Sequence, residues 1–328
     1  MNMVYQFFRN NHILAICEDA IECKSYCLNL SRFEMSDVPD LVEKCDLLLK
    51  LFMNHNQLIK IPNTLSTLTR LQILTLDYNK LDEFPTVICR LSNLRTLNVS
   101  CNQIETLPSS IGNLTMLETF WCNNTGLRHI PEELGNCEHL ETFGARGNKL
   151  ERLPVSIGLL SGLRWLTLES NELTDLPASF GALEKLVHLN LKSNFLTQIP
   201  RCLADLKKLQ FVYLNGNRID NIPVSSILEG TNFMRMLNLS HNPISNDEDT
   251  RERLRNYTHI FFDEHSTLTN TDFIGDIDDD MQEDEFSDWE NSVETSDLDT
   301  TDESSPENDI EDISVLIPEL SRYITNFG

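Results

Sequence analysis

The sequence predicts an α/β solenoid, in which short strands stack into a parallel sheet on a concave face and irregular or 3-10 segments form the convex face. Three observations predict it. Nine prolines stand 23 residues apart, at Pro39, Pro62, Pro85, Pro108, Pro131, Pro154, Pro177, Pro200 and Pro223. Asparagines follow the same period, at Asn56, Asn79, Asn102, Asn148, Asn171, Asn194 and Asn217. Apolar residues alternate before each asparagine position, as expected of a strand with one buried side.

Residues 94–116 illustrate one repeat. Leu94 and Leu97 sit at the spacing that turns strand side chains toward a core. Asn102 follows where the chain must turn, and its amide can bond backbone groups that no strand ladder satisfies. Pro108 then begins a return segment, because proline lacks the N–H that a continuing ladder needs. One repeat is too small to bury a core alone, so the repeats must stack on each other.

The solenoid is expected to span residues 25–245 in about ten repeats, with a cap at each end. Residues 1–24 place apolar side chains at helical spacing and are expected to form an N-terminal helical cap over the exposed core edge. Residues 246–262 begin with acids and continue with arginines, as suits a helix dipole, and are expected to form the C-terminal cap.

The chain carries a net charge of −25, and most of this charge belongs to a tail. Residues 263–312 hold 21 Asp and Glu and no Lys or Arg, so we expect this segment to be a disordered acidic tail. Residues 313–328 regain apolar side chains at helical spacing and are expected to be a short amphipathic segment, either a docking peptide or a terminus without function.

Ser287, Ser296, Thr300 and Ser304 in the tail each have an acid three positions later. This spacing suits an acidophilic kinase of the casein-kinase-two type. Phosphate at these sites would deepen the negative charge of the tail.

Nine cysteines, an odd number, show no pairing pattern, and several occupy core positions of the repeat. We therefore expect free thiols in a reducing compartment, hence a cytoplasmic protein with a nuclear location as the alternative. A zinc site is not expected, because no group of four His and Cys residues forms. No apolar run is long enough to span a membrane, and the N-terminus is a poor signal peptide.

Nothing in the sequence assembles a catalytic site. Glycine-rich phosphate loops, nucleophile elbows and metal-binding helices are missing, and the eight histidines are scattered and expected at the surface. We expect a monomeric non-enzyme without cofactor, metal or small-molecule substrate. Direct nucleic-acid binding is not expected either, because no basic patch is present.

The concave face, formed by the strand side chains that point away from the core, is the candidate site. Gly144 stands between Trp121 and Trp165 on neighbouring strands, which predicts a dip walled by two indoles, with Arg146 and Glu169 on its rim. Aromatic residues and arginine dominate binding hot spots. The full candidate set is Trp121, Gly144, Arg146, Trp165, Glu169, His188, Lys192, Phe211 and Tyr213.

One alternative interpretation speaks against this candidate site, and one observation speaks for it. The indoles could instead lie flat over Gly144 and shield the backbone, with Arg146 and Glu169 paired across strands. In favour of binding, the same repeat breaks its own pattern, with Cys122 in a leucine position and Thr125 in the asparagine position. Local departures of this kind are expected at functional sites.

The repeat reads L-x-x-L-x-L-x-x-N-x-L-x-x-L-P-x-x-I-x-x-L, the leucine-rich-repeat pattern. It resembles the 23-residue intracellular class of Ras-pathway scaffold (Soc-2-like) proteins. The resemblance implies a scaffold or adaptor in intracellular signalling that binds a protein on its concave face. Two alternatives remain open: an acidic-tail chaperone or inhibitor of histones or other basic proteins, and a substrate receptor of a ubiquitin ligase.

Overall fold

The computed structural model describes residues 3–222 and 234–263. These residues belong to one compact unit, Met1–Thr267. The acidic tail beyond Asp263, the four candidate phosphorylation sites Ser287, Ser296, Thr300 and Ser304, and the segment 313–328 lie outside the described residues.

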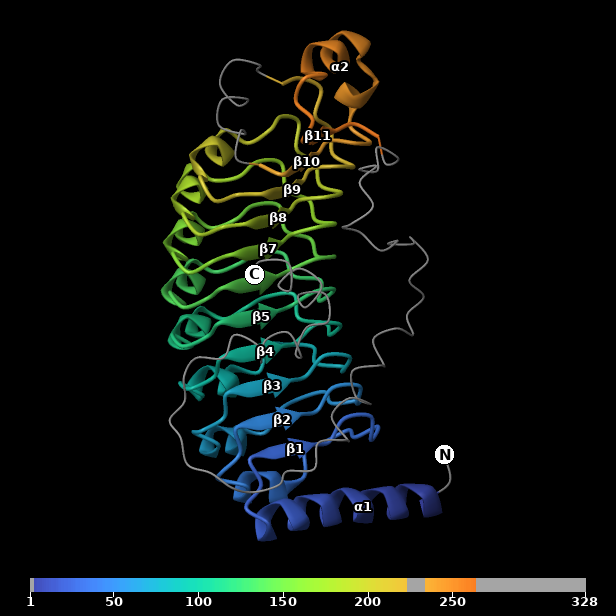
Figure 1. Ribbon diagram of the computed structural model, residues 1–328. Coiled ribbons are helices and arrows are strands. Elements are labelled where there is room, and N and C mark those ends of the chain that lie inside the picture. The colour runs from blue at the N-terminus through green and yellow to red at the C-terminus, as the bar shows by residue number, and fades with distance from the viewer. Residues whose placement is uncertain (1–2, 223–233, 264–328) are drawn as a thin grey trace, which may run out of the picture. The chain divides into compact units, whose positions relative to one another are not determined.

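The described residues form one parallel sheet whose strands follow each other in chain order, β1 to β11 (Figure 1). The strands are β1 (Cys27–Asn29), β2 (Lys50–Phe52), β3 (Ile73–Thr75), β4 (Thr96–Asn98), β5 (Thr119–Trp121), β6 (Thr142–Gly144), β7 (Trp165–Thr167), β8 (His188–Asn190), β9 (Phe211–Tyr213), β10 (Met236–Asn238) and β11 (Ile260–Phe261). Successive strands pair without a register shift, so residues 23 apart lie side by side from β1 to β9. The predicted α/β solenoid is confirmed.

Short 3-10 helices return the chain on the side of the core opposite to the sheet (Figure 1). They are η1 (Asp40–Lys44), η2 (Asn63–Thr67), η3 (Thr86–Arg90), η4 (Ser109–Asn113), η5 (Glu132–Asn136), η6 (Val155–Leu159), η7 (Ala178–Ala182), η8 (Arg201–Asp205) and η9 (Pro243–Asn246). A proline directly precedes each of η1 to η8, as Pro108 does at φ −74°. Because its φ is fixed, the proline sets the direction in which the return segment leaves.

One continuous apolar core lies between the sheet and the 3-10 helices. The middle residue of each three-residue strand points into it, and Phe120 and Phe143 stack there with ring centroids 5.6 Å apart. The residues on either side of the middle one therefore point outward and form the concave face.

Buried asparagines tie neighbouring repeats together. The Asn102 amide donates to the carbonyl oxygens of Leu76 and Val99, each at 2.9 Å, and its oxygen accepts the N–H of Leu81 at 3.0 Å. The same pattern recurs at Asn79, Asn148, Asn171, Asn194, Asn217 and Asn242. Each amide satisfies backbone groups that would otherwise be buried without partners.

A helix lies at each end of the stack (Figure 1). Helix α1 (Met3–Glu22) packs at the β1 end, where Ile13 and Cys17 join the core. Helix α2 (Glu248–Leu254) lies at the other end, within the segment expected as a C-terminal cap. That segment also returns to the sheet as β11, so the sheet has one strand more than the ten repeats predict. Two bonds hold β11 in place, from Leu237 N–H to His259 O at 2.8 Å and from Leu239 N–H to Phe261 O at 2.7 Å.

Candidate protein-binding surface

The concave face carries the predicted site residues on five neighbouring strands, β5 to β9. In one row across the strands, Thr142 pairs with Trp165, Trp165 with His188, and His188 with Phe211. In the next row, Trp121 pairs with Gly144, and Asn190 with Tyr213. The register thus brings these candidates together as the sequence predicts, although their side chains do not form the predicted dip.

Trp121 fills the place where the dip was expected. A Cβ atom at Gly144 would lie 2.0 Å from Cε3 and 2.3 Å from Cζ3 of the indole, so the ring occupies the space of a side chain at position 144. Gly144 is accordingly buried. The prediction of a dip walled by two indoles is wrong, because the lack of a Cβ atom at Gly144 lets the Cε3–Cζ3 edge of the neighbouring indole fill that space.

Trp165 behaves differently, because its indole stacks on His188. The two rings are parallel within 2° and their centroids lie 3.6 Å apart, while the ring centroid of Tyr213 lies 5.2 Å from that of His188. We call Trp165, His188, Phe211 and Tyr213 the aromatic patch. Trp165, Phe211 and Tyr213 are all partly exposed, so the patch offers apolar surface on three neighbouring strands.

His188 lies in the middle of the aromatic patch and is only 6% exposed, contrary to the expected surface position. Burial lowers the pKa of His188 from 6.5 to about 3, so the imidazole is neutral at physiological pH. Its Nδ1 atom is buried and has no hydrogen-bond partner in the described part of the chain. The packing of the two flanking rings therefore holds a polar group away from water.

Glu169 pairs with the strand that follows it and not with Arg146. Its carboxylate lies 3.6 Å from Nζ of Lys192 and accepts the side-chain N–H of Asn190 at 3.1 Å. The alternative of an Arg146–Glu169 pair is thus wrong as well. Asn190 is not among the predicted site residues, and the structure shows that its side-chain amide donates to Glu169.

Arg146 projects from the end of β6 and is exposed. Its backbone N–H donates to Oδ1 of Asn123 at 2.8 Å. Burial raises the pKa of Tyr78 to about 12, with smaller contributions from Cys101 and Asp77, while the charge of Arg146 acts in the opposite direction. The positive charge of Arg146 also acts to lower the pKa of the Cys101 thiol, which burial raises. Within residues 3–222 and 234–263, Arg146 forms no ion pair.

The two irregular residues of this repeat, Cys122 and Thr125, do not reach the concave face. Cys122 is 1% exposed and Thr125 is 3% exposed. The Thr125 hydroxyl donates to Cys122 O at 3.2 Å and lies 3.0 Å from Oδ1 of Asn148. The departure from the repeat pattern is accommodated in the core and is not evidence for a binding site.

The third residue after the end of each strand from β2 to β10 adopts a left-handed backbone at the edge of the concave face. These residues include His55, Tyr78, Cys101, Asn124, Gly147, Ser170, Ser193, Gly216 and His241, with φ between 52° and 68°. His55 and Tyr78 stack there at 4.3 Å. At Gly147 a Cβ atom would lie 1.9 Å from Oδ1 of Asn124, so a larger residue there would force the Asn124 side chain to move.

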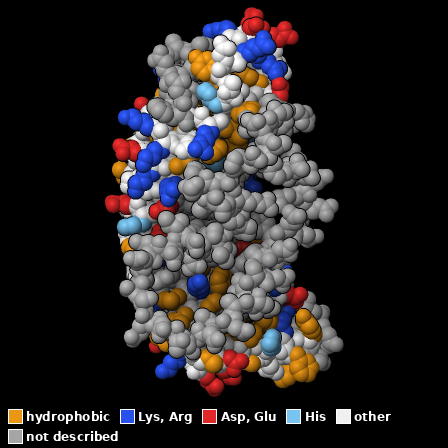
Figure 2. Space-filling model, in the orientation of Figure 1, with side chains coloured by type: hydrophobic (Ala, Val, Ile, Leu, Met, Phe, Trp, Pro, Cys, Tyr) orange, Lys and Arg blue, Asp and Glu red, His pale blue; other side chains and the backbone are white. Residues whose placement is uncertain are grey.

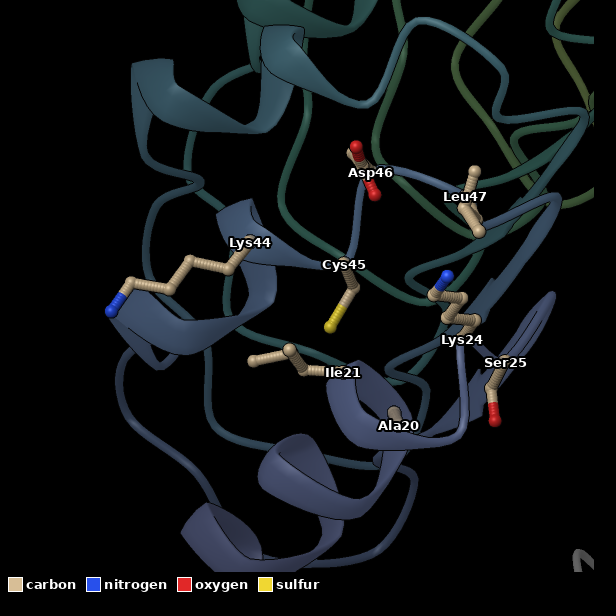
Figure 3. A pocket seen from close by; sticks show the side chains of 8 residues that line it. All are labelled: Ala20, Ile21, Lys24, Ser25, Lys44, Cys45, Asp46 and Leu47. Carbon is tan, nitrogen blue, oxygen red and sulfur yellow. The ribbon is translucent and has the colours of Figure 1, made fainter.

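The hollows at the N-terminal end lie away from the aromatic patch. One, of about 20 Å³, lies between α1 and η1 and is large enough for about one water molecule. Figure 3 shows the Cys45 thiol pointing toward Ile21 and Ala20 there. A more open hollow of about 310 Å³ lies beside it, between the end of α1 and β1. Neither has the enclosed, mostly apolar form of a small-molecule site.

The thiols of the described residues are all free. Burial raises the pKa of the Cys137 thiol to about 12 and that of Cys17 to about 11. These cysteines act as small apolar side chains in the core. Among the described residues, no group of three or more His, Cys, Asp or Glu side chains is arranged to hold a metal ion.

A second apolar surface lies on α1. Hydrophobic side chains gather at the lower end of the space-filling view, which is the end where α1 lies (Figure 2). Phe7 and Phe8 are 62% and 66% exposed, and Tyr5 is 57% exposed. None of the helices in the described part of the chain is long and apolar enough to cross a membrane.

Comparison with known families identifies the repeat. Residues 161–219 match one leucine-rich-repeat family model, and residues 93–114 match a second. No curated protein sequence matches the chain. The repeat pattern, the sheet and the two matches together establish a leucine-rich-repeat fold.

Solved structures of leucine-rich-repeat proteins are similar to this chain. One is a protein of Leptospira interrogans, 28% identical, with a TM-score of 0.61 over 69% of this chain and 63% of that one. Another is the ectodomain of the Arabidopsis thaliana membrane receptor kinase GASSHO1/SCHENGEN3 in complex with CASPARIAN STRIP INTEGRITY FACTOR 2, 32% identical, with a TM-score of 0.58 over 66% of this chain and 27% of that one. A third is a plant peptide hormone receptor in complex with RGF2, 30% identical, with a TM-score of 0.56 over 63% of this chain and 34% of that one. This chain thus spans less than two thirds of each of these proteins.

Proposed function

We propose that this leucine-rich-repeat protein is a non-catalytic adaptor that binds a partner protein at the aromatic patch of its concave face. The observation that carries the proposal is the patch itself. Trp165, Phe211 and Tyr213 are partly exposed on a rigid sheet, and their positions are fixed by strand register and by stacking on His188. Rigid aromatic side chains lose little conformational entropy on binding and dominate binding energy.

The surroundings of the patch suit a protein ligand. Neighbouring strands lie about 4.8 Å apart, so three strands offer an apolar strip roughly 10 Å long, enough for a few residues of an extended segment. The ion pair of Glu169 and Lys192 lies beside the strip and supplies polar contacts at its rim. Two of the similar structures are receptors solved in complex with a named ligand, one of them a peptide hormone receptor.

Affinity capture with matched variants tests the proposal. Phe211→Ala/Tyr213→Ala removes two partly exposed rings from the patch, and Val155→Ala/Leu159→Ala removes two exposed apolar side chains from η6 on the convex side, where they are 66% and 60% exposed. We expect the first variant to lose partners that the second retains. If the two rings are hot spots worth about 2 kcal/mol, the affinity for such a partner should fall by roughly 30-fold or more. Equal retention by both variants would contradict the proposal.

The finer assignments follow the resemblance to the intracellular scaffold class. We propose a monomer that acts in intracellular signalling, in the cytoplasm or the nucleus. Microscopy of the tagged full chain and light scattering of the purified protein check location and oligomeric state.

A second candidate function is a chaperone or inhibitor of basic proteins, favoured by the 21 Asp and Glu within residues 263–312. Binding through these charges would weaken steeply with salt, because exposed charges more than about 8 Å apart are screened at physiological ionic strength. Binding at the aromatic patch would persist. A salt titration of histone binding, with the full chain and a chain that ends at residue 263, distinguishes the two.

A further inference from the structure

A cluster of cations borders the aromatic patch at the edge of the sheet where the strands begin. Lys185 and Lys208 precede β8 and β9 by three residues each, so they occupy the same place in consecutive repeats, about 4.8 Å apart along the stack. In Figure 2, Lys and Arg side chains gather on the left of the view, at the level of β7 to β10. We call the exposed residues of this cluster the basic edge: Arg164, Lys185, Lys207, Lys208 and Arg235.

The two arginines of the basic edge stand directly beside the aromatic patch. Arg164 immediately precedes Trp165, and its carbonyl oxygen accepts the N–H of His188 at 3.1 Å. Arg235 immediately precedes the residue of β10 that pairs with Phe211. The cations and the rings are thus carried by the same run of strands, so one ligand can contact both.

The positive charges of the basic edge are not neutralised within the described residues. None of its five cations forms an ion pair there, whereas Lys192, beyond the other end of the strands, pairs with Glu169 at 3.6 Å. One acid, Glu184, stands among the cations, next to Lys185 in the chain. The basic edge therefore offers positive charge to a ligand.

The same edge of the sheet is acidic one step earlier in the stack. Glu118 and Glu141 stand directly before β5 and β6, in the place that Arg164 takes before β7, and Glu138 lies three residues before Glu141. The positive charge thus coincides with the strands that carry the aromatic patch. An anionic ligand is attracted to β7–β10 and repelled from β5 and β6, which defines its position along the stack.

We propose that the partner segment bound at the aromatic patch is an acidic peptide. Its carboxylates pair with the basic edge, while its apolar side chains contact Trp165 and Phe211. In an extended segment successive side chains point to opposite sides, so a peptide that alternates acidic and apolar residues meets the cations and the rings at once. This inference rests on the proposed function and names the chemistry of the partner.

A single-stranded nucleic acid also combines rings with negative charge, but this face suits it less. It carries a charge at every phosphate, so its binding depends on a continuous basic groove. The basic edge ends where Glu141 stands beside Arg164, and the whole chain has a net charge of −25, whereas nucleic-acid-binding domains are basic. A peptide can place its carboxylates only where the cations lie.

Labelled peptides test the inference on the full chain. The probe is a fluorescein-labelled peptide of sequence Glu-Phe-Glu-Phe-Glu-Phe, and its two counterparts carry Gln or Lys in place of each Glu. At low salt we expect the acidic peptide to bind roughly three- to tenfold more tightly than the neutral one, as two exposed charge pairs would give, and the basic peptide to bind most weakly. The preference should shrink at about 0.5 M salt, which screens exposed charges.

Two matched charge reversals locate the preference. Lys185→Glu/Lys208→Glu should abolish the preference for the acidic peptide. Lys60→Glu/Lys149→Glu reverses two exposed lysines outside the basic edge and changes the net charge of the chain equally, so it should leave the preference intact. Urea unfolding checks that both variants are folded.

The inference is overturned if the acidic and neutral peptides bind the wild type equally, or if the two charge reversals have the same effect. It is also overturned if a thymidine hexanucleotide binds more tightly than the acidic peptide. The proposed function is judged separately, because Phe211→Ala/Tyr213→Ala should weaken the binding of the acidic and neutral peptides alike. Failure of that variant to weaken either peptide or to reduce partner capture would contradict the proposed function.

Discussion

Gly144→Ala is the substitution that most sharply tests the geometry of the concave face. The new Cβ atom would lie 2.0 Å from the Trp121 ring, whereas ordinary contact begins at 3.4 Å. The indole must therefore leave its place on the backbone. Inserting one methyl group into a packed site typically costs about 1–3 kcal/mol, and we expect a destabilisation in this range.

Urea unfolding of four proteins measures the effect: wild type, Gly144→Ala, Trp121→Ala and the double variant. If the cost arises from the indole, Gly144→Ala should destabilise the wild type but have little effect once Trp121 is replaced by alanine, which gives a coupling energy of about 1 kcal/mol or more. In the chain labelled with fluorotryptophan, the fluorine NMR signal of Trp121 should move toward that of an exposed indole in the Gly144→Ala variant. Equal costs in both backgrounds, or an unchanged signal, would refute the assignment of Trp121 to this position.

Other predictions concern the buried polar groups. Burial lowers the pKa of His188 from 6.5 to about 3. Between pH 3 and pH 6.5 the imidazole therefore binds a proton in the unfolded chain but not in the folded one, so the free energy of unfolding falls as the pH drops below about 6.5. By pH 5 the wild type should have lost about 2 kcal/mol more than His188→Gln in urea unfolding, and parallel pH profiles would disprove the burial of a neutral imidazole. Asn102→Ala should cost about 2–4 kcal/mol, since it removes bonds to Leu76, Val99 and Leu81, and calorimetry of the variant checks this value. Thr125→Asn should stabilise the fold by about 0.5–1.5 kcal/mol, because an amide there can accept the N–H of Ile104 as Asn102 accepts that of Leu81; a lower melting temperature would contradict this expectation.

The repeat register could be predicted from the sequence because it depends on local rules. Proline, asparagine and alternating leucines at a fixed period fix the strand, the turn and the return segment of each unit, and stacking then follows from the need to bury one side. The extra strand β11 could not be found this way. Ile260 and Phe261 lack the repeat pattern around them, and their pairing with β10 depends on how α2 returns the chain to the sheet.

The sequence predicted which residues of the candidate site are adjacent on neighbouring strands, but not how their side chains contact each other. Register alone places Trp121 beside Gly144 and Trp165 beside His188. Whether an indole stands up or lies flat depends on side-chain rotation, which the register does not determine. The lack of a Cβ atom at Gly144 lets the edge of the Trp121 ring approach the backbone there, and the ring of His188 gives Trp165 a stacking partner.

The ion-pair partner of Glu169 could not be predicted from the sequence either. Both Arg146 and Lys192 lie on neighbouring strands, one on each side of it, and the sequence treats them alike. In the structure Asn190 donates to the carboxylate and Lys192 is its ion-pair partner. Among the described residues, Arg146 is then the cation on this part of the face that forms no ion pair, and the sequence alone does not show this.

Site-specific photo-crosslinking tests most directly whether the concave face binds a partner. A photoreactive phenylalanine analogue replaces Phe211 on the aromatic patch or, as the control, Leu159 on the convex side of the full chain. We expect a partner to crosslink at position 211 and not at position 159, and Tyr213→Ala to reduce the crosslink. Crosslinking at position 159 alone, or equal yields at both positions, would contradict this expectation.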